Sequence, residues 1–180
     1  EHGREPKHIF KSDEDAHFAK VYEIDLATIK PIVAKPHFVD SVVDAKECVG
    51  TQIDQAFLGS CNNGRIEDLR VGAELIKGKK VHPLVRFLVV PASAAVYRQA
   101  LAEGIIDIFM EAGAIVMNPN CSVCWGSCQG VIGEGEVLIS TGTRNFKGRA
   151  GHKDSFVYLA SAATVTASAI KGVIATADML

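Results

Sequence analysis

Three cysteines at two places in the chain are the side chains best suited to carry chemistry. Cys61 lies in the segment GSCNNGR, while Cys121 and Cys124 form a C-x-x-C pair in NPNCSVCWG. A cubane iron–sulfur cluster takes one thiolate for each of its irons, so three cysteines leave the fourth iron open to water or a substrate. We therefore predict a 4Fe-4S cluster on Cys61, Cys121 and Cys124 that acts as a Lewis acid rather than as an electron carrier.

A structural zinc site and a dithiol redox pair are the alternatives for the C-x-x-C pair. A structural zinc site usually has two close ligand pairs or histidines at short spacing. A redox pair would leave Cys61 without a role. Of the two remaining cysteines, we expect Cys48 to be a buried thiol and Cys128 to be structural, although Cys128 could substitute as a ligand.

Arg144 and Arg149, five residues apart in STGTRNFKGRAG, are the candidate substrate-binding residues. A guanidinium group stays charged and holds a carboxylate through two parallel N–H bonds. A single arginine is more often solvated or in a surface ion pair. These two follow an apolar strand, on the side where we expect the cysteines. For His37 and His152, which lie near these loops, we expect a surface or hydrogen-bonding role.

The composition is typical of an ordinary folded domain with reduced thiols. The 180 residues are 48% hydrophobic and carry a formal net charge of -2, and this length can bury a core without disulfides. The charge, without a basic stripe, argues against a nucleic-acid partner. The opening residues of this sequence do not show the basic and apolar regions typical of an export signal, and no apolar run is long enough to cross a bilayer. We therefore expect a cytoplasmic protein that binds neither nucleic acid nor membrane.

Strands that alternate with helices must position these side chains. This alternation predicts an α/β domain of three layers, α/β/α, with a mainly parallel sheet covered on both faces. We expect an irregular arm at residues 1–20 and one domain at residues 21–180. The expected strands lie at 21–32, 53–60, 85–93, 114–118, 136–141 and 156–161, and the expected helices at 65–77, 94–112 and 163–172.

Each candidate side chain follows one of these strands. Cys61 comes directly after AFLGS, the C-x-x-C pair follows AIVMN, and Arg144 follows EVLIS. The carboxyl ends of parallel strands meet at one edge of a sheet, where loops converge and helices begin. We therefore expect the three thiols to meet at this edge.

Three ordered segments, GSCNNGRIEDLR, the C-x-x-C pair and RNFKGR, closely resemble the aconitase superfamily. They are most similar to the large subunits of its 3-isopropylmalate dehydratase and homoaconitase branch, from about Tyr22 to the end of the chain. The resemblance implies a hydro-lyase that isomerises a hydroxy polycarboxylic acid by dehydration and rehydration. It also implies that the three cysteines bind the 4Fe-4S cluster and that the two arginines hold the substrate. A homoaconitase, an aconitase and a non-catalytic iron- or redox-sensing module are the alternatives.

The chain departs from this family in two residues and in its extent. Asn62 stands where the family usually has threonine, and Thr143 where it usually has asparagine. Family enzymes also have a preceding region with catalytic histidine and acidic residues, and a swivel domain, often a small subunit, with a serine base. The resemblance therefore implies the C-terminal, third domain of a large subunit. We expect it to be inactive alone, without a certain catalytic residue, and to have the preceding region and the small subunit as partners.

Overall fold

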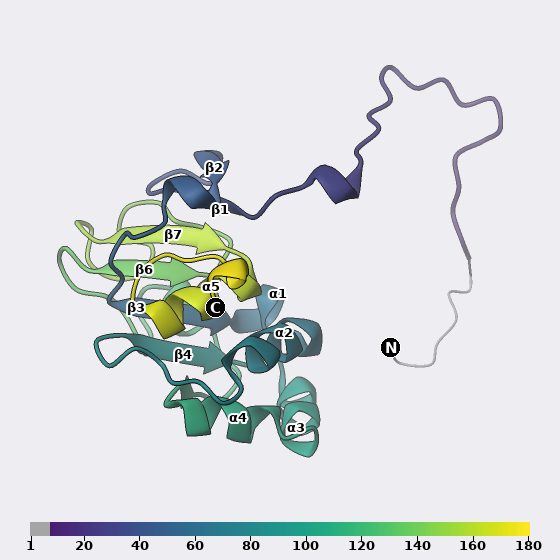
Figure 1. Cartoon of the computed structure of the whole chain (residues 1–180). Helices are drawn as coiled ribbons and strands as arrows, with labels where there is room; N and C mark the ends of the chain where they lie inside the picture. Colours follow the sequence, from purple (N-terminus) through teal and green to yellow (C-terminus); the bar gives the residue numbers. More distant parts are fainter. Residues whose placement is uncertain (1–7) are drawn as a thin grey trace.

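A seven-stranded sheet forms the centre of the computed structural model, which describes residues 8–180 (Figure 1). The strand order is β2-β1-β7-β6-β3-β4-β5, in which β3 to β7 run parallel while β1 pairs antiparallel with β2 and β7. The α/β class and the mainly parallel sheet are thus confirmed. The bounds are β1 Ile32–Ala34, β2 Val42–Asp44, β3 Gln55–Gly59, β4 Arg86–Val90, β5 Ile115–Val116, β6 Val137–Ser140 and β7 Phe156–Ala160.

The α-helices pack on one face of this sheet. Side chains that alternate along β3 and β4 divide between two cores, and Leu58 and Phe87 belong to the helical one. Phe109 of α4 meets Phe87 edge to face, with ring centroids 6.0 Å apart. Gly72 brings α2 close to the sheet, since a Cβ there would lie 2.7 Å from Leu58 Cδ2. The helices of this layer are α2 Ile66–Ile76, α3 Ala94–Ala102, α4 Ile105–Ala112 and α5 Ala162–Lys171.

Loops rather than α-helices cover the other face. Val123, Ile132 and Ala150, from the segments after β5 and β6, pack against Phe57 and Leu88. Crossover connections between parallel strands are right-handed, so the direction in which the next strand is added decides which face the connection covers. From β3 to β5 the strands are added toward one edge of the sheet, and β6 and β7 are then added on the other side of β3. The connections of these two groups therefore cover opposite faces. Both faces are covered, as predicted, but this layer consists of loops and the 3-10 helix η3, Ser122–Cys124, where the three-layer α/β/α prediction expected α-helices.

The helix predicted at 94–112 is two helices, so that prediction was wrong. Gly104 separates α3 from α4 and adopts the left-handed conformation, with φ of 71°. Glycine takes this conformation without the clash that a Cβ would make, so the chain can turn there. Apolar residues recur at helical spacing on both sides of Gly104, so the sequence pattern gave no sign of the turn.

The strand predicted at 21–32 was also wrong. A 3-10 helix, η1 Leu26–Thr28, lies there and is capped by Asp25, whose carboxylate accepts the Ala27 N–H at 2.9 Å. Tyr22 is 73% exposed, so the apolar side chains that alternate in this segment do not pack against the rest of the domain. The structure shows neither helix nor strand at 8–20, and the rest of the arm predicted at 1–20 lies outside the described residues. The division into an arm and a domain stays a prediction. No helix of residues 8–180 is long and apolar enough to cross a membrane.

Candidate cluster and substrate site

The strand order reverses between β3 and β6, and hydrogen bonds join their carboxyl ends. Thr141, the residue after β6, is buried, and its Oγ1 accepts the Gly59 N–H at 2.9 Å. Asn63 reaches across the same gap and donates from Nδ2 to the Thr141 carbonyl. Open α/β sheets bind ligands at such a reversal point. This edge of the sheet is therefore the expected place for a site.

Cys61 lies between β3 and α2, as predicted, in the one-turn helix α1 Ser60–Asn63. The chain turns sharply there, since Ser60 has a φ of 68°, which is uncommon for a residue other than glycine. A Cβ on Gly59 or Gly64 would lie 2.2 or 2.4 Å from the Val90 carbonyl oxygen. These two glycines therefore hold the turn against the end of β4. Cys61 itself is exposed and lines a pocket of about 540 Å³.

The C-x-x-C loop is anchored by the two residues between its cysteines. Ser122 and Val123 are 0% and 1% exposed, and Ser122 Oγ donates to the Gln129 carbonyl at 2.9 Å. Cys121 is exposed and Cys124 is half-buried. The loop therefore holds its centre in the core and leaves its thiols at the surface.

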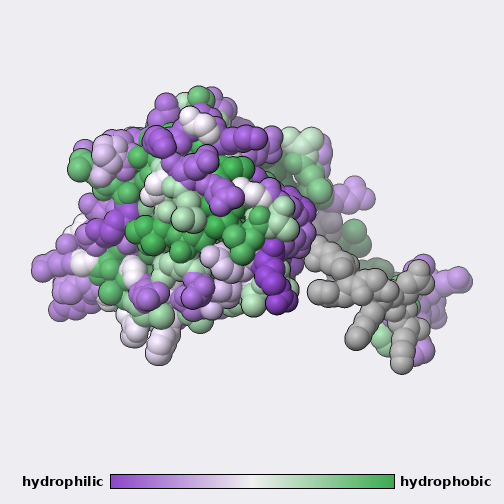
Figure 2. All heavy atoms as spheres, turned by 90° about the horizontal axis from the view of Figure 1, so that it is seen from below, coloured by the Kyte–Doolittle hydropathy of each residue, from purple (hydrophilic) through white to green (hydrophobic). Residues whose placement is uncertain are grey.

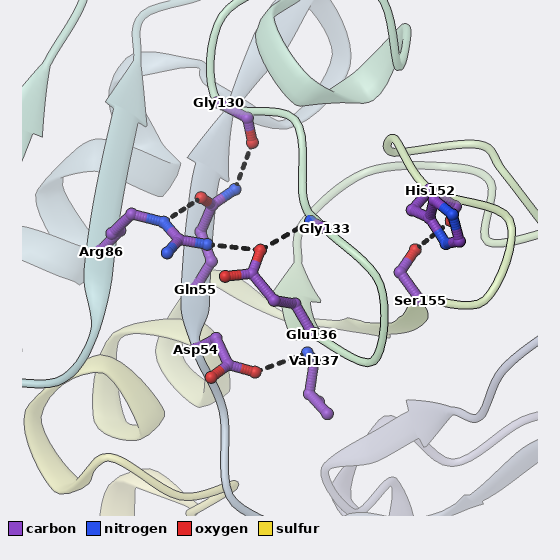
Figure 3. A network of polar contacts seen from close by, with 9 residues as sticks. All are labelled: Asp54, Gln55, Arg86, Gly130, Gly133, Glu136, Val137, His152 and Ser155. Atoms are coloured by element: carbon purple, nitrogen blue, oxygen red, sulfur yellow. Dashed lines mark hydrogen bonds and ion pairs between the residues drawn. The ribbon is translucent and has the colours of Figure 1, made fainter.

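A polar network fixes the far end of this loop (Figure 3). Gln55 is fully buried and donates from Nε2 to the Gly130 carbonyl at 2.6 Å, while Arg86 Nε donates to Gln55 Oε1 at 2.9 Å. Arg86 also pairs with Glu136 at 2.8 Å, and the Gly133 N–H donates to the same carboxylate at 2.7 Å. Burial alone would raise the pKa of Glu136, but the Gly133 amide and the Arg86 guanidinium lower it below its ordinary value.

This network was missed in the sequence. A signal was available, because polar residues stand at the start of two strands that are otherwise apolar.

The two candidate arginines have different surroundings. Arg144 is exposed, and its Nη1 donates to the carbonyl of the preceding residue, Thr143, at 2.7 Å. Arg149 is half-buried, with Nη2 3.8 Å from Cys124 Sγ and its guanidinium 5.6 Å from the centre of the Phe146 ring. The structure thus brings one predicted substrate residue into contact with one predicted cluster ligand. Arg149 Nε is buried and has no hydrogen-bond partner among the described residues.

Asn145, between the two arginines, is a further anchor that was missed. It is fully buried, and its Nδ2 donates to the carbonyls of Lys35 at 2.8 Å and of Phe38 at 3.2 Å. These bonds fix the loop between β1 and β2 to the arginine loop. Its partners lie more than 100 residues away in the chain, so local sequence gave no signal for it.

The remaining cysteines and histidines have local roles. Cys48 is buried, as expected, and burial raises the pKa of its thiol. Cys128 is half-buried with its sulfur 3.9 Å from Asn120 Oδ1. The half-buried ring of His37 lies against Phe156, with centroids 5.7 Å apart. Its buried Nδ1 has no hydrogen-bond partner among the described residues, so the structure shows packing where a surface or hydrogen-bonding role was expected. The exposed His152 accepts the N–H of Asp154 at 3.2 Å.

Within residues 8–180, no three side chains of histidine, cysteine, aspartate or glutamate lie close enough to share one metal ion. A cubane distributes its thiolates over separate irons, so its ligands lie farther apart than those of a single ion. The donor set fits such a cluster, since Cys61, Cys121 and Cys124 all follow parallel strands at one sheet edge with accessible or half-buried thiols. Their meeting around one cluster stays a prediction.

Comparison with known proteins identifies the family of the chain. The model of the aconitase family (aconitate hydratase) matches residues 44–172. The 3-isopropylmalate dehydratase large subunit of Hydrogenobaculum sp. (strain Y04AAS1) is 52% identical over 172 residues, which are 96% of this chain and 41% of that protein. The large subunit of Aquifex aeolicus (strain VF5) is 52% identical over 180 residues, 97% of this chain and 42% of that protein. The chain therefore spans about two fifths of the length of these relatives. It belongs to the aconitase family.

Proposed function

We propose that the chain is the iron–sulfur domain of the large subunit of a 3-isopropylmalate dehydratase, a hydro-lyase of leucine biosynthesis. Such an enzyme isomerises a hydroxy polycarboxylic acid by removing water and adding it back. The contact between Arg149 and Cys124 carries the proposal, because it places a carboxylate-binding cation beside a thiol. The names of the relatives favour isopropylmalate over homocitrate or citrate as the substrate.

We assign the cluster to Cys61, Cys121 and Cys124. Thiolates are the ligands that iron–sulfur clusters take, and these three lie in the segments that follow β3 and β5. Bound there, a 4Fe-4S cluster would supply a Lewis-acidic iron that no cysteine ligates and that is open to the substrate.

Arg144 and Arg149 are proposed to bind and orient the substrate. Arg144 is exposed at the edge where the thiols lie, so its guanidinium can accept a carboxylate without first breaking a buried contact. Arg149 comes from a half-buried position beside Cys124. Two carboxylates held at fixed points would limit the rotation of the carbon chain and align its hydroxyl with the thiol-bearing loops.

The catalytic base is proposed to come from companion parts, namely a preceding region of the large subunit and a small subunit. Apolar side chains exposed on this chain support such contacts, because patches of this kind mark interaction surfaces. They gather at the centre of the face seen from the side of α3 and α4 (Figure 2), and others lie in the segment before β1. Exposed examples are Phe10, Phe18, Tyr22, Leu26, Leu84 and Met110. Inactivity of the isolated chain and a cytoplasmic location stay predictions.

An assay of the assembled enzyme tests this function. The chain would be combined with its companion region and a small subunit, loaded anaerobically with iron and sulfide, and given isopropylmalate, homocitrate or citrate. We expect isomerisation of isopropylmalate and none by the chain alone. Activity on homocitrate or citrate instead would reassign the substrate. An iron-loaded assembly that isomerises none of the three would contradict the hydro-lyase.

A further inference from the structure

The loops that follow β5 and β6 form one connected unit. The N–H of Ile132 donates to the carbonyl of Ala150 at 3.0 Å, and the N–H of His152 donates back to the Ile132 carbonyl at 2.9 Å. A Cβ on Gly151 would lie 2.3 Å from that same Ile132 oxygen, so the two backbones are in direct contact. Val123, between the paired cysteines, belongs to the same apolar core as Ile132 and Ala150. The C-x-x-C loop and the arginine loop are thereby held to each other.

Gly126 is a point of close backbone approach between the two loops, beside the cysteines. Its φ of +78° is one that side chains rarely adopt, and a Cβ there would lie 2.3 Å from the carbonyl oxygen of Arg149. Any side chain at position 126 would have to push the Arg149 backbone away. A residue two positions after Cys124 thus sets how near Arg149 can come.

The Arg149 side chain lies beside this point of close approach and reaches Cys124. Its Nη2 lies 3.8 Å from Cys124 Sγ, the Phe146 ring lies against the guanidinium, and Nε is buried without a partner among the described residues. The donor fork is therefore aimed at the sulfur from inside the loop layer. Arg144, by contrast, is exposed and bonds its neighbouring carbonyl.

We infer that Arg149 is a positioning residue for Cys124, in addition to its proposed contact with substrate, and that Gly126 is the residue that permits this contact. Arg149 donates to the Cys124 sulfur and holds the C-x-x-C loop in the geometry that a cluster needs. This inference rests on the proposed function for its consequence at the cluster, but the loop contact itself exists in this chain without one. Arg144 has no such role and serves the substrate alone.

Two pairs of variants and one further control separate donation to sulfur from simple packing. Arg149→Met keeps the length of the stem beside Phe146 and removes the donors, whereas Arg149→Lys keeps a charged donor. Gly126→Ala introduces both the positive-φ strain and the contact with Arg149. Gly135→Ala is its control, because Gly135 has a φ of +74° with nothing within 4 Å of a Cβ. Arg144→Met is the control for loss of a guanidinium from the same loop.

The first readout is amide hydrogen exchange of residues 121–126 in the cluster-free assembled enzyme. We expect faster exchange in Arg149→Met and Gly126→Ala, partial protection in Arg149→Lys, and native exchange in Gly135→Ala and Arg144→Met. The second readout is the rate at which visible absorbance is lost from the iron-loaded enzyme under a chelator. Since partners that orient metal ligands affect metal affinity 10- to 100-fold, loss should be about tenfold faster in Arg149→Met and unchanged in Arg144→Met.

The outcomes distinguish this inference from the proposed function. Native exchange at 121–126 in Arg149→Met, or equal effects of Arg149→Met and Arg149→Lys on both readouts, would overturn the positioning role and leave plain packing. Failure of the native enzyme to take up any cluster would instead contradict the proposed function, and the exchange experiment would still decide the loop contact. A rise in KM without faster cluster loss in Arg149→Met would make Arg149 a substrate residue only.

Discussion

The hydroxyl oxygen of Thr141 accepts the N–H of Gly59 at 2.9 Å, which joins the carboxyl ends of β6 and β3 where the strand order reverses. Cys61 lies two residues beyond Gly59, so this bond determines how the loop with Cys61 leaves the sheet. The relationship lies at the centre of the proposed site and can be tested without a cofactor.

Replacement of Thr141 by valine should lower the free energy of unfolding by about 1–3 kcal/mol, because it leaves the buried Gly59 N–H without a partner. Urea unfolding measures this difference. Thr166→Val is the matched control, since the Thr166 hydroxyl is buried with no partner among the described residues. That variant should be neutral or more stable. Equal destabilisation of the two variants would show that the hydrogen bond between Gly59 and Thr141 does not contribute to the free energy of unfolding.

Replacement of Asn145 by alanine should also destabilise the chain, by about 1–3 kcal/mol, because the carbonyls of Lys35 and Phe38 lose their buried donor. Amide exchange of residues 35–41 should become faster in this variant. Asn62→Ala, at an exposed position, should leave both quantities unchanged. Unchanged exchange at 35–41 in Asn145→Ala would rule out the anchoring role.

Replacement of Gly72 by alanine should cost about 1–3 kcal/mol through overpacking, although alanine is the better helix former. The new Cβ would lie 2.7 Å from Leu58 and 3.0 Å from Phe109, so α2 would have to move away from the sheet. Thermal unfolding reports the effect. Gly133→Ala, whose Cβ would meet nothing nearer than 3.7 Å, should be neutral or slightly stabilising. A stable Gly72→Ala protein would mean that this contact is loose.

The loss of folding stability at acid pH should depend on Glu136. Its pKa is lower in the folded chain than the ordinary value of 4.5, so its contribution is fully present above pH 4.5 and is lost as the pH falls through the folded value. Glu136→Gln should therefore destabilise the protein at neutral pH and flatten the decline of stability below pH 4.5. Urea unfolding between pH 3 and about 7 measures this slope. Glu134→Gln, at an exposed neighbour, should retain the native decline, and the same decline in Glu136→Gln would contradict the assignment.

Local patterns in the sequence predicted the elements that carry the site. Helix α2 follows from apolar residues at helical spacing with Glu67 and Asp68 in the first turn, and β3 from a nearly continuous apolar run. Because β3 is parallel to its neighbours, the position of Cys61 at the carboxyl edge of the sheet could be predicted as well. Patterns within about ten residues were sufficient for these parts.

Contacts between distant segments could not be predicted in this way. Gln55 meets Gly130 across 75 residues, and Asn145 meets Lys35 across 110. Such pairs depend on how strands are ordered in the sheet, which a single sequence does not state. The turn at Gly104 escaped for a different reason, because apolar spacing continued on both sides of it. The contact of Arg149 with Cys124 was likewise visible only once both loops were placed on the same face.

The decisive experiment is the measurement of iron and sulfide content after anaerobic reconstitution. We expect about four irons per assembled enzyme with the native chain. We expect loss of the cluster and its absorbance in Cys61→Ser, Cys121→Ser and Cys124→Ser, with native content in the control Cys128→Ser. Full iron content and absorbance in any of the first three variants would contradict the proposal that these cysteines hold the cluster.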